Sequence, residues 1–148
     1  MYRKIIPDIV AATKIFTIKQ NGRASEAAKL MAKKNIAAII VVDGNGKISG
    51  IVTERDICQK IIACDLDPAT TAVRDIMTAN PDTLSPEDSA GDALELMQSR
   101  QYRHLPVVQN GKCLAVVSIR DLYTAIKESL EEDIREAEAF IFGDRHEA

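Results

Sequence analysis

The sequence of 148 residues contains no tryptophan and few aromatic side chains of any kind. Aromatic residues make up 4% of the chain, whereas 46% of its residues are hydrophobic, so alanine, isoleucine, valine and leucine must build the interior. A chain of this length buries about 68–70% of the surface that its unfolded state exposes, which is sufficient for a core of its own. Charged residues of both signs are well mixed, which is typical of a folded protein and not of a disordered one.

Long apolar runs are missing as well. The longest spans residues 36–42, whereas a membrane-spanning helix needs about 20 apolar residues. The start of the chain also lacks the apolar stretch and the small-residue cleavage site of a signal peptide. We therefore expect a cytoplasmic protein that does not enter the membrane.

Cysteine, histidine and net positive charge are scarce. Cys58, Cys64 and Cys113 are an odd number without C-x-x-C spacing, so they predict neither a disulfide framework nor a zinc site, and we expect three reduced thiols. The formal net charge of -3 gives no basic footprint for nucleic acid. No set of nucleophile, base and orienting group is visible, so we expect a non-enzyme without catalytic residues, metal or obligatory cofactor.

The chain instead contains an internal repeat. Residues 17–42 match residues 83–108 at a shift of 66 positions, and after a one-residue gap the match continues at a shift of 65. The identical pairs include Thr17 and Thr83, Ala24 and Ala90, Ala27 and Ala93, Met31 and Met97, and Arg55-Asp56 and Arg120-Asp121. Matches that keep their order over this length indicate a duplication.

Each copy predicts the element order β-α-β-β-α. Apolar residues at 24, 27, 28 and 31, repeated at 90, 93, 94 and 97, have helical spacing. Strands are predicted at 38–42 and 48–53 and again at 105–108 and 113–118, joined by turns at Asp43-Gly44-Asn45-Gly46 and Asn110-Gly111. The fold class is therefore α/β (α+β), with a first repeat over 1–66, a second over 67–127 and an acidic helical tail over 128–148. Because one such unit is small for a stable core, we expect the two to pack together with pseudo-two-fold symmetry.

A polar signature stands twice at the point where a strand passes into a helix, as Thr53-Glu54-Arg55-Asp56 and Ser118-Ile119-Arg120-Asp121. One interpretation is structural, because a hydroxyl followed three residues later by an acid forms a capping box worth about 1 kcal/mol. That interpretation does not account for Arg55 and Arg120, since arginine in a first helical turn opposes the helix dipole. A helix N-terminus with a hydroxyl, a carboxylate and an arginine suits a ribose phosphate.

These residues resemble those of a tandem pair of cystathionine-β-synthase (CBS) domains, a Bateman module. The family pattern of a glycine, two apolar residues, Thr or Ser, two variable residues and Asp is complete at 50–56, and 115–121 departs from it only at Ala115. Residues 103–108 and 75–78 also resemble the second strand and the leading segment of a CBS domain. The resemblance covers about residues 5–127.

The resemblance implies two pseudo-symmetric sites for adenosine-type ligands in a cleft between the copies. The ribose contacts would fall to Asp56 and Asp121, with Thr53 and Ser118 nearby. Phosphate-directed candidates are Arg55, Arg120, Arg103 and His104, and Pro106 belongs to the same second-copy segment. Because the first copy has Ala37-Ala38-Ile39-Ile40 where the second has Arg103-His104-Leu105-Pro106, we predict at most one strong site, which depends most on Arg103, His104, Arg120 and Asp121. For His104, a half-exposed strand residue without a ligand role is the equal alternative.

The tail differs in composition from the rest. Residues 127–148 hold three basic and eight acidic residues, a net charge of -5. Leu130, Ile134, Ala137 and Ile141 recur at 4-3-4 spacing and form an apolar seam on a predicted helix. The seam packs either on its own module or on a second copy, and we expect a homodimer.

Two functions from different classes follow. The first is a regulatory or sensor module that binds AMP, ADP, ATP, NAD(H) or S-adenosylmethionine and signals to an unknown protein partner in trans. The alternative is a constitutive dimeric scaffold with a degenerate nucleotide site, which Ala115 and the apolar first-copy strand favour. The sequence does not choose among these ligands.

Overall fold

The first repeat forms the predicted order of elements, strand, helix, two strands and helix. In a computed structural model that describes residues 3–143, it consists of β1 (Thr17–Lys19), α1 (Ala24–Lys34), β2 (Ala38–Val42), β3 (Ile48–Thr53), α2 (Glu54–Asp56) and the helical turn η2 (Ile57–Ile62). Helix α1 ends where Asn35 adopts a left-handed conformation and its N–H donates to the carbonyls of Ala32 and Met31. The turn between β2 and β3 has φ of 77° at Gly46, a conformation that favours glycine. Local backbone conformation thus determines where the chain leaves α1 to enter β2 and where it turns between β2 and β3.

The second repeat has the same order with one reduction. It consists of η3 (Val73–Asp75), β4 (Thr78–Ala79), α3 (Ala90–Arg100), β5 (His104–Gln109), β6 (Lys112–Ser118) and α4 (Ile119–Gly143). The strand expected to open this copy is reduced to a single parallel bridge between Leu84 and Val107. The turn between β5 and β6 carries positive φ at Asn110 and Gly111, as two-residue hairpins require.

The segments that lead into the two repeats pack on the opposite repeats. Strand β4 closes a four-stranded sheet in the order β1-β2-β3-β4, while β5 and β6 form a sheet of two strands. The buried Val73 and Ile76 belong to the core of the first repeat. The N-terminal helical turn η1 (Ile5–Ile9) conversely packs on the second repeat, where Ile5 is fully buried and its N–H donates to the Asp88 carbonyl at 2.8 Å. Each half thus needs a segment that precedes the other, which explains how two small cores form one stable body.

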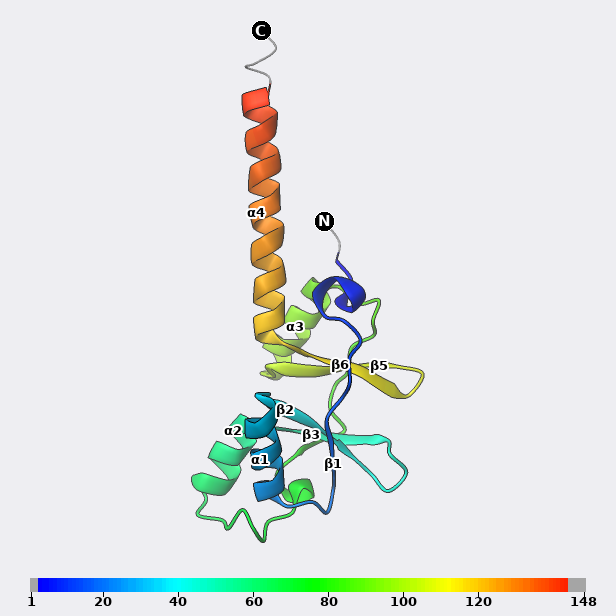
Figure 1. Ribbon diagram of the computed structural model, residues 1–148, viewed down its shortest axis with the longest axis vertical. Helices are drawn as coiled ribbons and strands as arrows, with labels where there is room; N and C mark the ends of the chain where they lie inside the picture. The colour runs from blue at the N-terminus through cyan, green and yellow to red at the C-terminus, as the bar shows by residue number, and fades with distance from the viewer. Residues whose placement is uncertain (1–2, 144–148) are drawn as a thin grey trace.

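The two sheets face each other across a third apolar cluster. Ala38, Ile40 and Ile51 of the first sheet are buried there, and Cys113 and Val116 of β6 pack against them. Figure 1 shows the two repeats stacked along the long axis of the molecule, with the sheets at their junction. The fold is therefore the expected α+β pair of repeats with a C-terminal helix, whereas the division of the chain at residues 66 and 127 stays a prediction.

Gly50 is the glycine of the family motif in the first repeat, where the second repeat has Ala115. Crowding by neighbouring atoms explains why the first repeat needs glycine at this position. A Cβ at Gly50 would lie 2.5 Å from Met77 Sδ and 2.9 Å from the Thr78 carbonyl oxygen. Because Asp8-Ile9 repeats Asp75-Ile76, the position of Met77 corresponds to Val10 in the other half. The shorter Val10 side chain is compatible with a methyl group at the equivalent position, Ala115.

Helix α4 extends far from the repeats, with a length of about 37 Å at 1.5 Å per residue. Among its residues only Leu122 and Ala125 are buried, and Figure 1 shows the helix projecting as a rod. Leu130, Ile134 and Ile141 of the predicted seam are each more than half exposed, so the seam does not pack on its own module. The last five residues of the predicted tail, 144–148, lie outside the described residues. Within residues 3–143, no helix combines the length and the apolar character needed to cross a membrane.

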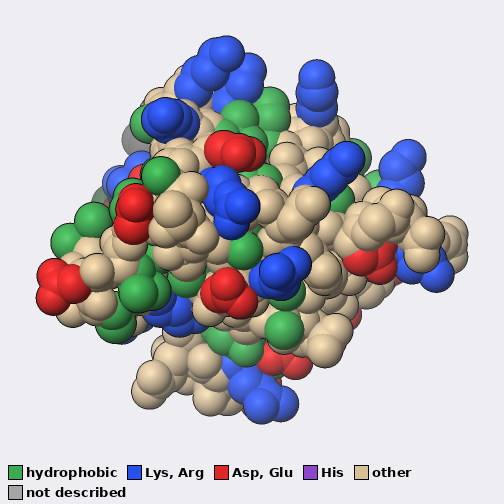
Figure 2. All heavy atoms as spheres, turned by 90° about the horizontal axis from the view of Figure 1, so that it is seen from below, with side chains coloured by type: hydrophobic (Ala, Val, Ile, Leu, Met, Phe, Trp, Pro, Cys, Tyr) green, Lys and Arg blue, Asp and Glu red, His purple; other side chains and the backbone are tan. Residues whose placement is uncertain are grey.

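Charge is unevenly distributed along the molecule. Helix α4 carries seven acidic and three basic residues. Figure 2 looks onto the opposite end, formed by the first repeat, and shows many lysine and arginine side chains spread across it, with fewer Asp and Glu side chains among them. The two ends of the long axis therefore differ in charge.

Candidate functional site

Two cavities of similar size lie between the repeats, and each is lined by both. The first, here called the Asp121 cavity, has a volume of about 650 Å³. The second, here called the Asp56 cavity, has a volume of about 640 Å³. Both volumes fall within the range of about 300–1,000 Å³ that is typical of small-molecule sites.

Each cavity combines the polar signature of one repeat with a loop of the other. The Asp121 cavity joins Ser118, Arg120 and Asp121 to residues 35–38 of the first repeat. The Asp56 cavity joins Thr53, Arg55 and Asp56 to residues 100–104 of the second. In both loops a helix ends at a left-handed residue, Asn35 or Gln101, and the chain then enters a strand. The crosswise arrangement explains why one repeat alone does not build a complete site.

Backbone hydrogen bonds hold these loops against the signatures of their own repeats. The Glu54 N–H donates to the Ala37 carbonyl at 3.0 Å, and the Ile119 N–H donates to the Arg103 carbonyl at 2.8 Å. The position of Arg103 is thus fixed by the helix start that carries the second signature. A displacement of either helix start would move the loop that lines the other cavity.

The capping interpretation of the signatures is confirmed. Asp56 Oδ2 accepts from the N–H of Thr53 at 2.9 Å and from its hydroxyl at 3.2 Å, while the Asp56 N–H donates to Thr53 Oγ1 at 3.3 Å. The same bonds join Ser118 and Asp121, at 2.8, 3.0 and 3.2 Å respectively. Each carboxylate therefore has one oxygen in the capping box, which leaves the other for a second partner.

That second oxygen is where the two signatures differ. Asp56 Oδ1 forms an ion pair with Lys60 Nζ at 3.0 Å, and the side chain of Asp56 is 13% exposed. Asp121 Oδ1 has no hydrogen-bond or ion-pair partner within residues 3–143. Lys60 was not among the predicted site residues, although it stands four positions after Asp56, the spacing at which helical side chains meet.

Arg103 and His104 line both cavities and are shared between them. Burial lowers the pKa of the half-buried His104 below its ordinary value, and the Arg103 charge adds to this, while Asp121 and Glu54 act in the opposite direction. His104 is therefore a neutral imidazole near neutral pH and can donate or accept a hydrogen bond in the cleft.

The structure brings together eight of the nine predicted site residues. Arg103, His104, Arg120 and Asp121, on which the stronger site was predicted to depend, meet in the Asp121 cavity. Pro106 lines neither cavity, because it is buried in β5 opposite Val116. Sequence reasoning missed Glu54, which lines both cavities, and it also missed Lys60, Arg100 and Tyr102 of the Asp56 cavity.

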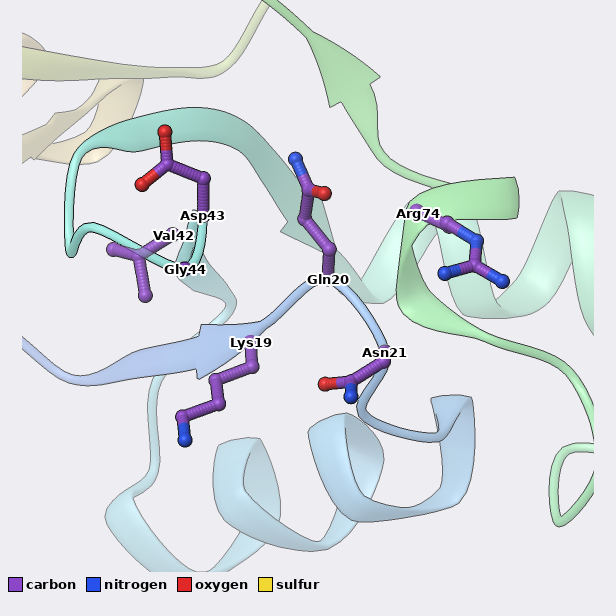
Figure 3. A pocket seen from close by; sticks show the side chains of 7 residues that line it. All are labelled: Lys19, Gln20, Asn21, Val42, Asp43, Gly44 and Arg74. Carbon is purple, nitrogen blue, oxygen red and sulfur yellow. The ribbon is translucent and has the colours of Figure 1, made fainter.

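A third cavity lies away from the cleft, at the ends of β1 and β2, and has a volume of about 380 Å³. It contains no residue of either signature. Figure 3 shows that its two cationic side chains, Lys19 and Arg74, point to different sides and do not converge. The cleft between the repeats is therefore the candidate site.

Comparison with protein families identifies the repeats. The CBS domain model matches residues 8–63 and 73–128. The chain belongs to the CBS-domain family. Tandem CBS pairs are in general regulatory modules that bind adenosine ligands.

Relatives of this CBS pair occur in chains of different lengths. An uncharacterized 17.7 kDa protein of Acidianus ambivalens is 36% identical over 118 residues, which cover 79% of this chain and 70% of that protein. The CBS domain-containing protein CBSCBSPB2 of Arabidopsis thaliana is 37% identical over 115 residues, covering 77% of this chain but only 22% of that protein. The same pair of domains thus also occurs within much longer proteins.

Solved CBS structures share the fold. A CBS-domain protein from Burkholderia ambifaria superposes with a TM-score of 0.74 at 39% identity, covering 78% of this chain and 84% of that one. A hexameric CBS-CP12 protein from cyanobacteria superposes with a TM-score of 0.76 at 26% identity, covering 97% and 85%.

Proposed function

We propose that this CBS pair is a regulatory module that binds an adenosine-type ligand in the cleft and signals to a protein partner in trans. The ligand class comprises AMP, ADP, ATP, NAD(H) and S-adenosylmethionine. The observation that supports the proposal is the pair of cavities, each with a capped helix start, a carboxylate and at least one arginine. Helix N–H groups and arginine bind phosphate, and a carboxylate accepts hydrogen bonds from ribose hydroxyls.

Regulation would follow from the crosswise construction of the cavities. A ligand in either cavity contacts the signature of one repeat and the loop of the other, so its binding energy depends on how the repeats are arranged. A ligand shifts a conformational equilibrium only to the extent that it binds the two states differently. The partner would read the resulting change in the cleft, and the proposal assigns no catalytic step to the chain.

A thermal-shift assay with AMP, ADP, ATP, NADH and S-adenosylmethionine tests this function. A ligand present at 100 times its dissociation constant adds about 2.7 kcal/mol to the free energy of unfolding. For a chain of this size the melting temperature would rise by about 5–10 °C. No shift with any of the five ligands would refute the proposal. Mass spectrometry of ligand that copurifies with fresh protein then identifies the natural one.

The alternative function is a dimeric scaffold, for which the exposed seam of α4 would supply the contact surface. Ile134 and Ile141 of the seam are each 56% exposed on a helix that extends beyond the repeats. We propose that a second copy covers this seam, so that the chain is a homodimer. A homodimer is compatible with both functions, and ligand binding distinguishes them.

The shared histidine predicts a pH dependence of AMP affinity. A phosphate beside His104 favours the imidazolium and raises a pKa that burial has lowered in the free protein. Binding therefore takes up a proton, so affinity is highest below the pKa of the free protein and falls as pH rises through the pKa of the complex. We expect AMP to bind several-fold more tightly at pH 6.5 than at pH 8, as measured by isothermal titration calorimetry.

His104→Gln is the control for this pH dependence. The phosphate of AMP itself titrates near pH 6, but that contribution is common to both proteins. The difference between wild type and His104→Gln therefore isolates the histidine. Equal pH profiles for the two proteins would contradict the prediction.

A further inference from the structure

The two cavities differ at the carboxylate that would meet a ribose. Lys60 Nζ pairs with Asp56 Oδ1 at 3.0 Å and also donates to the Ile76 carbonyl at 2.8 Å. The position that corresponds to Lys60 in the second repeat is Ala125, which is buried and carries no charge. Asp121 Oδ1 is thus available to accept a hydrogen bond, while Asp56 Oδ1 is already occupied by an ammonium group.

The cavities also differ in net charge. The Asp121 cavity has two arginines, Arg103 and Arg120, against two carboxylates, Glu54 and Asp121. The Asp56 cavity has the same number of carboxylates, Glu54 and Asp56, but four cations, which are Arg55, Lys60, Arg100 and Arg103. Arg100 is partly compensated by Asp82, whose Oδ2 lies 3.5 Å away. Arg55 and Arg103 have no ion-pair partner in the described part of the chain.

This difference has two sources, Lys60 on η2 and the loop that each repeat contributes to the opposite site. The first repeat supplies Asn35-Ile36-Ala37-Ala38, which is uncharged, whereas the second supplies Arg100-Gln101-Tyr102-Arg103-His104. Because Arg103 and His104 line both cavities, this loop adds only Arg100 to the Asp56 cavity alone. The other additional cation is Lys60, whose counterpart in the second repeat is the uncharged Ala125.

We propose that the two cavities bind adenosine ligands of different charge, and that Lys60 determines the difference. The Asp56 cavity takes a nucleoside di- or triphosphate, and the Asp121 cavity takes a nucleoside or nucleoside monophosphate. This inference rests on the proposed function, since it divides the same class of ligands between the two sites.

Lys60 is placed to act on a phosphate in spite of its ion pair. An ammonium group has three N–H donors, and two of them are used by Asp56 and the Ile76 carbonyl. The side chain of Lys60 is 44% exposed and lines the cavity. Its third donor and its charge are therefore available to a phosphate in this cavity, whereas the ribose contact available at Asp121 is weakened at Asp56.

Calorimetric titration of AMP and of ATP, in magnesium-free buffer, into the full chain and its Lys60→Met variant tests the proposal. Methionine keeps most of the apolar stem and removes the charge. We expect ATP affinity to fall about tenfold, the effect of losing one charged hydrogen bond, and AMP affinity to stay within twofold. Lys60→Arg retains the cation and is expected to restore most of the ATP affinity.

Lys33→Met is the matched control, because Lys33 is an exposed lysine of α1 that lines neither cavity. It should change neither affinity. The proposal is overturned if Lys60→Met leaves ATP affinity unchanged, or if it lowers AMP and ATP affinity by the same factor. If neither nucleotide binds the wild-type chain, the proposed function itself fails. If both nucleotides bind and Lys60→Met does not distinguish them, only the division of ligands between the two cavities fails.

Discussion

Replacing Asp121 by asparagine is expected to weaken AMP binding about ten- to hundredfold. Asp121 Oδ1 has no partner within the described residues, and Asp121 shares its cavity with Arg103, His104 and Arg120. A hydrogen bond from a ribose hydroxyl to a charged acceptor contributes about 1.5–3 kcal/mol, which corresponds to that range in dissociation constant. Isothermal titration calorimetry of wild type and Asp121→Asn measures it directly.

The chain offers a matched control for the structural part of this effect. Asp92 forms the same capping box with Ser89 at the start of α3, with bonds of 3.0 and 3.1 Å, and lines neither cavity of the cleft. The backbone and side-chain hydrogen bonds from Ser89 lower the pKa of Asp92, as expected for a capping carboxylate. Asp92→Asn should therefore lose a comparable cap and keep AMP affinity. Equal weakening by the two substitutions would show that the loss at Asp121 comes from the helix start and not from the ligand.

Asp56→Asn extends the comparison to the other cavity. Because Lys60 already occupies Asp56 Oδ1, the loss of AMP affinity should be clearly smaller than for Asp121→Asn. Equal losses would refute the prediction that the two sites are unequal.

The elements of the fold were largely predictable because their signals are local. The strands at 38–42 and 48–53 and the helix start at Thr53 depend on runs of apolar, mostly β-branched residues, a glycine turn and a capping pair, all within a few residues. The exchange of leading segments was not predictable in this way. The exchange depends on tertiary packing, because Ile5 completes the core of the second repeat and Val73 that of the first. Nothing within either segment specifies a partner so far along the chain.

The site was predictable only in part for the same reason. The repeated Thr or Ser and Asp identified both helix starts, but the loops that face them come from the opposite repeat. The sequence therefore did not determine which carboxylate Arg103 would serve, and the structure shows that it lines both cavities. The Lys60–Asp56 pair carried a local signal in its four-residue spacing, yet its importance emerges only when Ala125 is seen at the equivalent place.

Removal of residues 128–148 is expected to convert a homodimer into a monomer. The deletion takes away the seam formed by Leu130, Ile134, Ala137 and Ile141, of which the three large side chains are each more than half exposed. It leaves the part of α4 that packs on the second repeat, including Leu122 and Ala125. Within the chain it breaks the surface ion pairs of Arg3 with Glu128 and Glu132, which are worth about 0–1 kcal/mol each. Light scattering should show the mass fall from twice 16.2 kDa toward that of one shortened chain.

A double substitution, Leu130→Ser with Ile134→Ser, tests the seam without shortening the chain. It should give the same monomer, while Ile62→Ser, at an isoleucine 65% exposed on the first repeat, should leave the dimer intact. If the truncated chain and the double variant both keep the mass of a dimer, the seam is not the contact.

Salt dependence identifies what the seam packs against. In a parallel pair of α4 helices, Glu131, Asp133 and Glu138 flank the seam and face acidic residues of the other copy. Raising the salt concentration from about 0.1 to 1 M shortens the screening length from about 10 to 3 Å. Because this weakens the repulsion, the dimer should become tighter, as measured by sedimentation equilibrium. A dimer that loosens with salt would instead place the acidic helix against lysine and arginine side chains, such as those at the first-repeat end of the other copy (Figure 2).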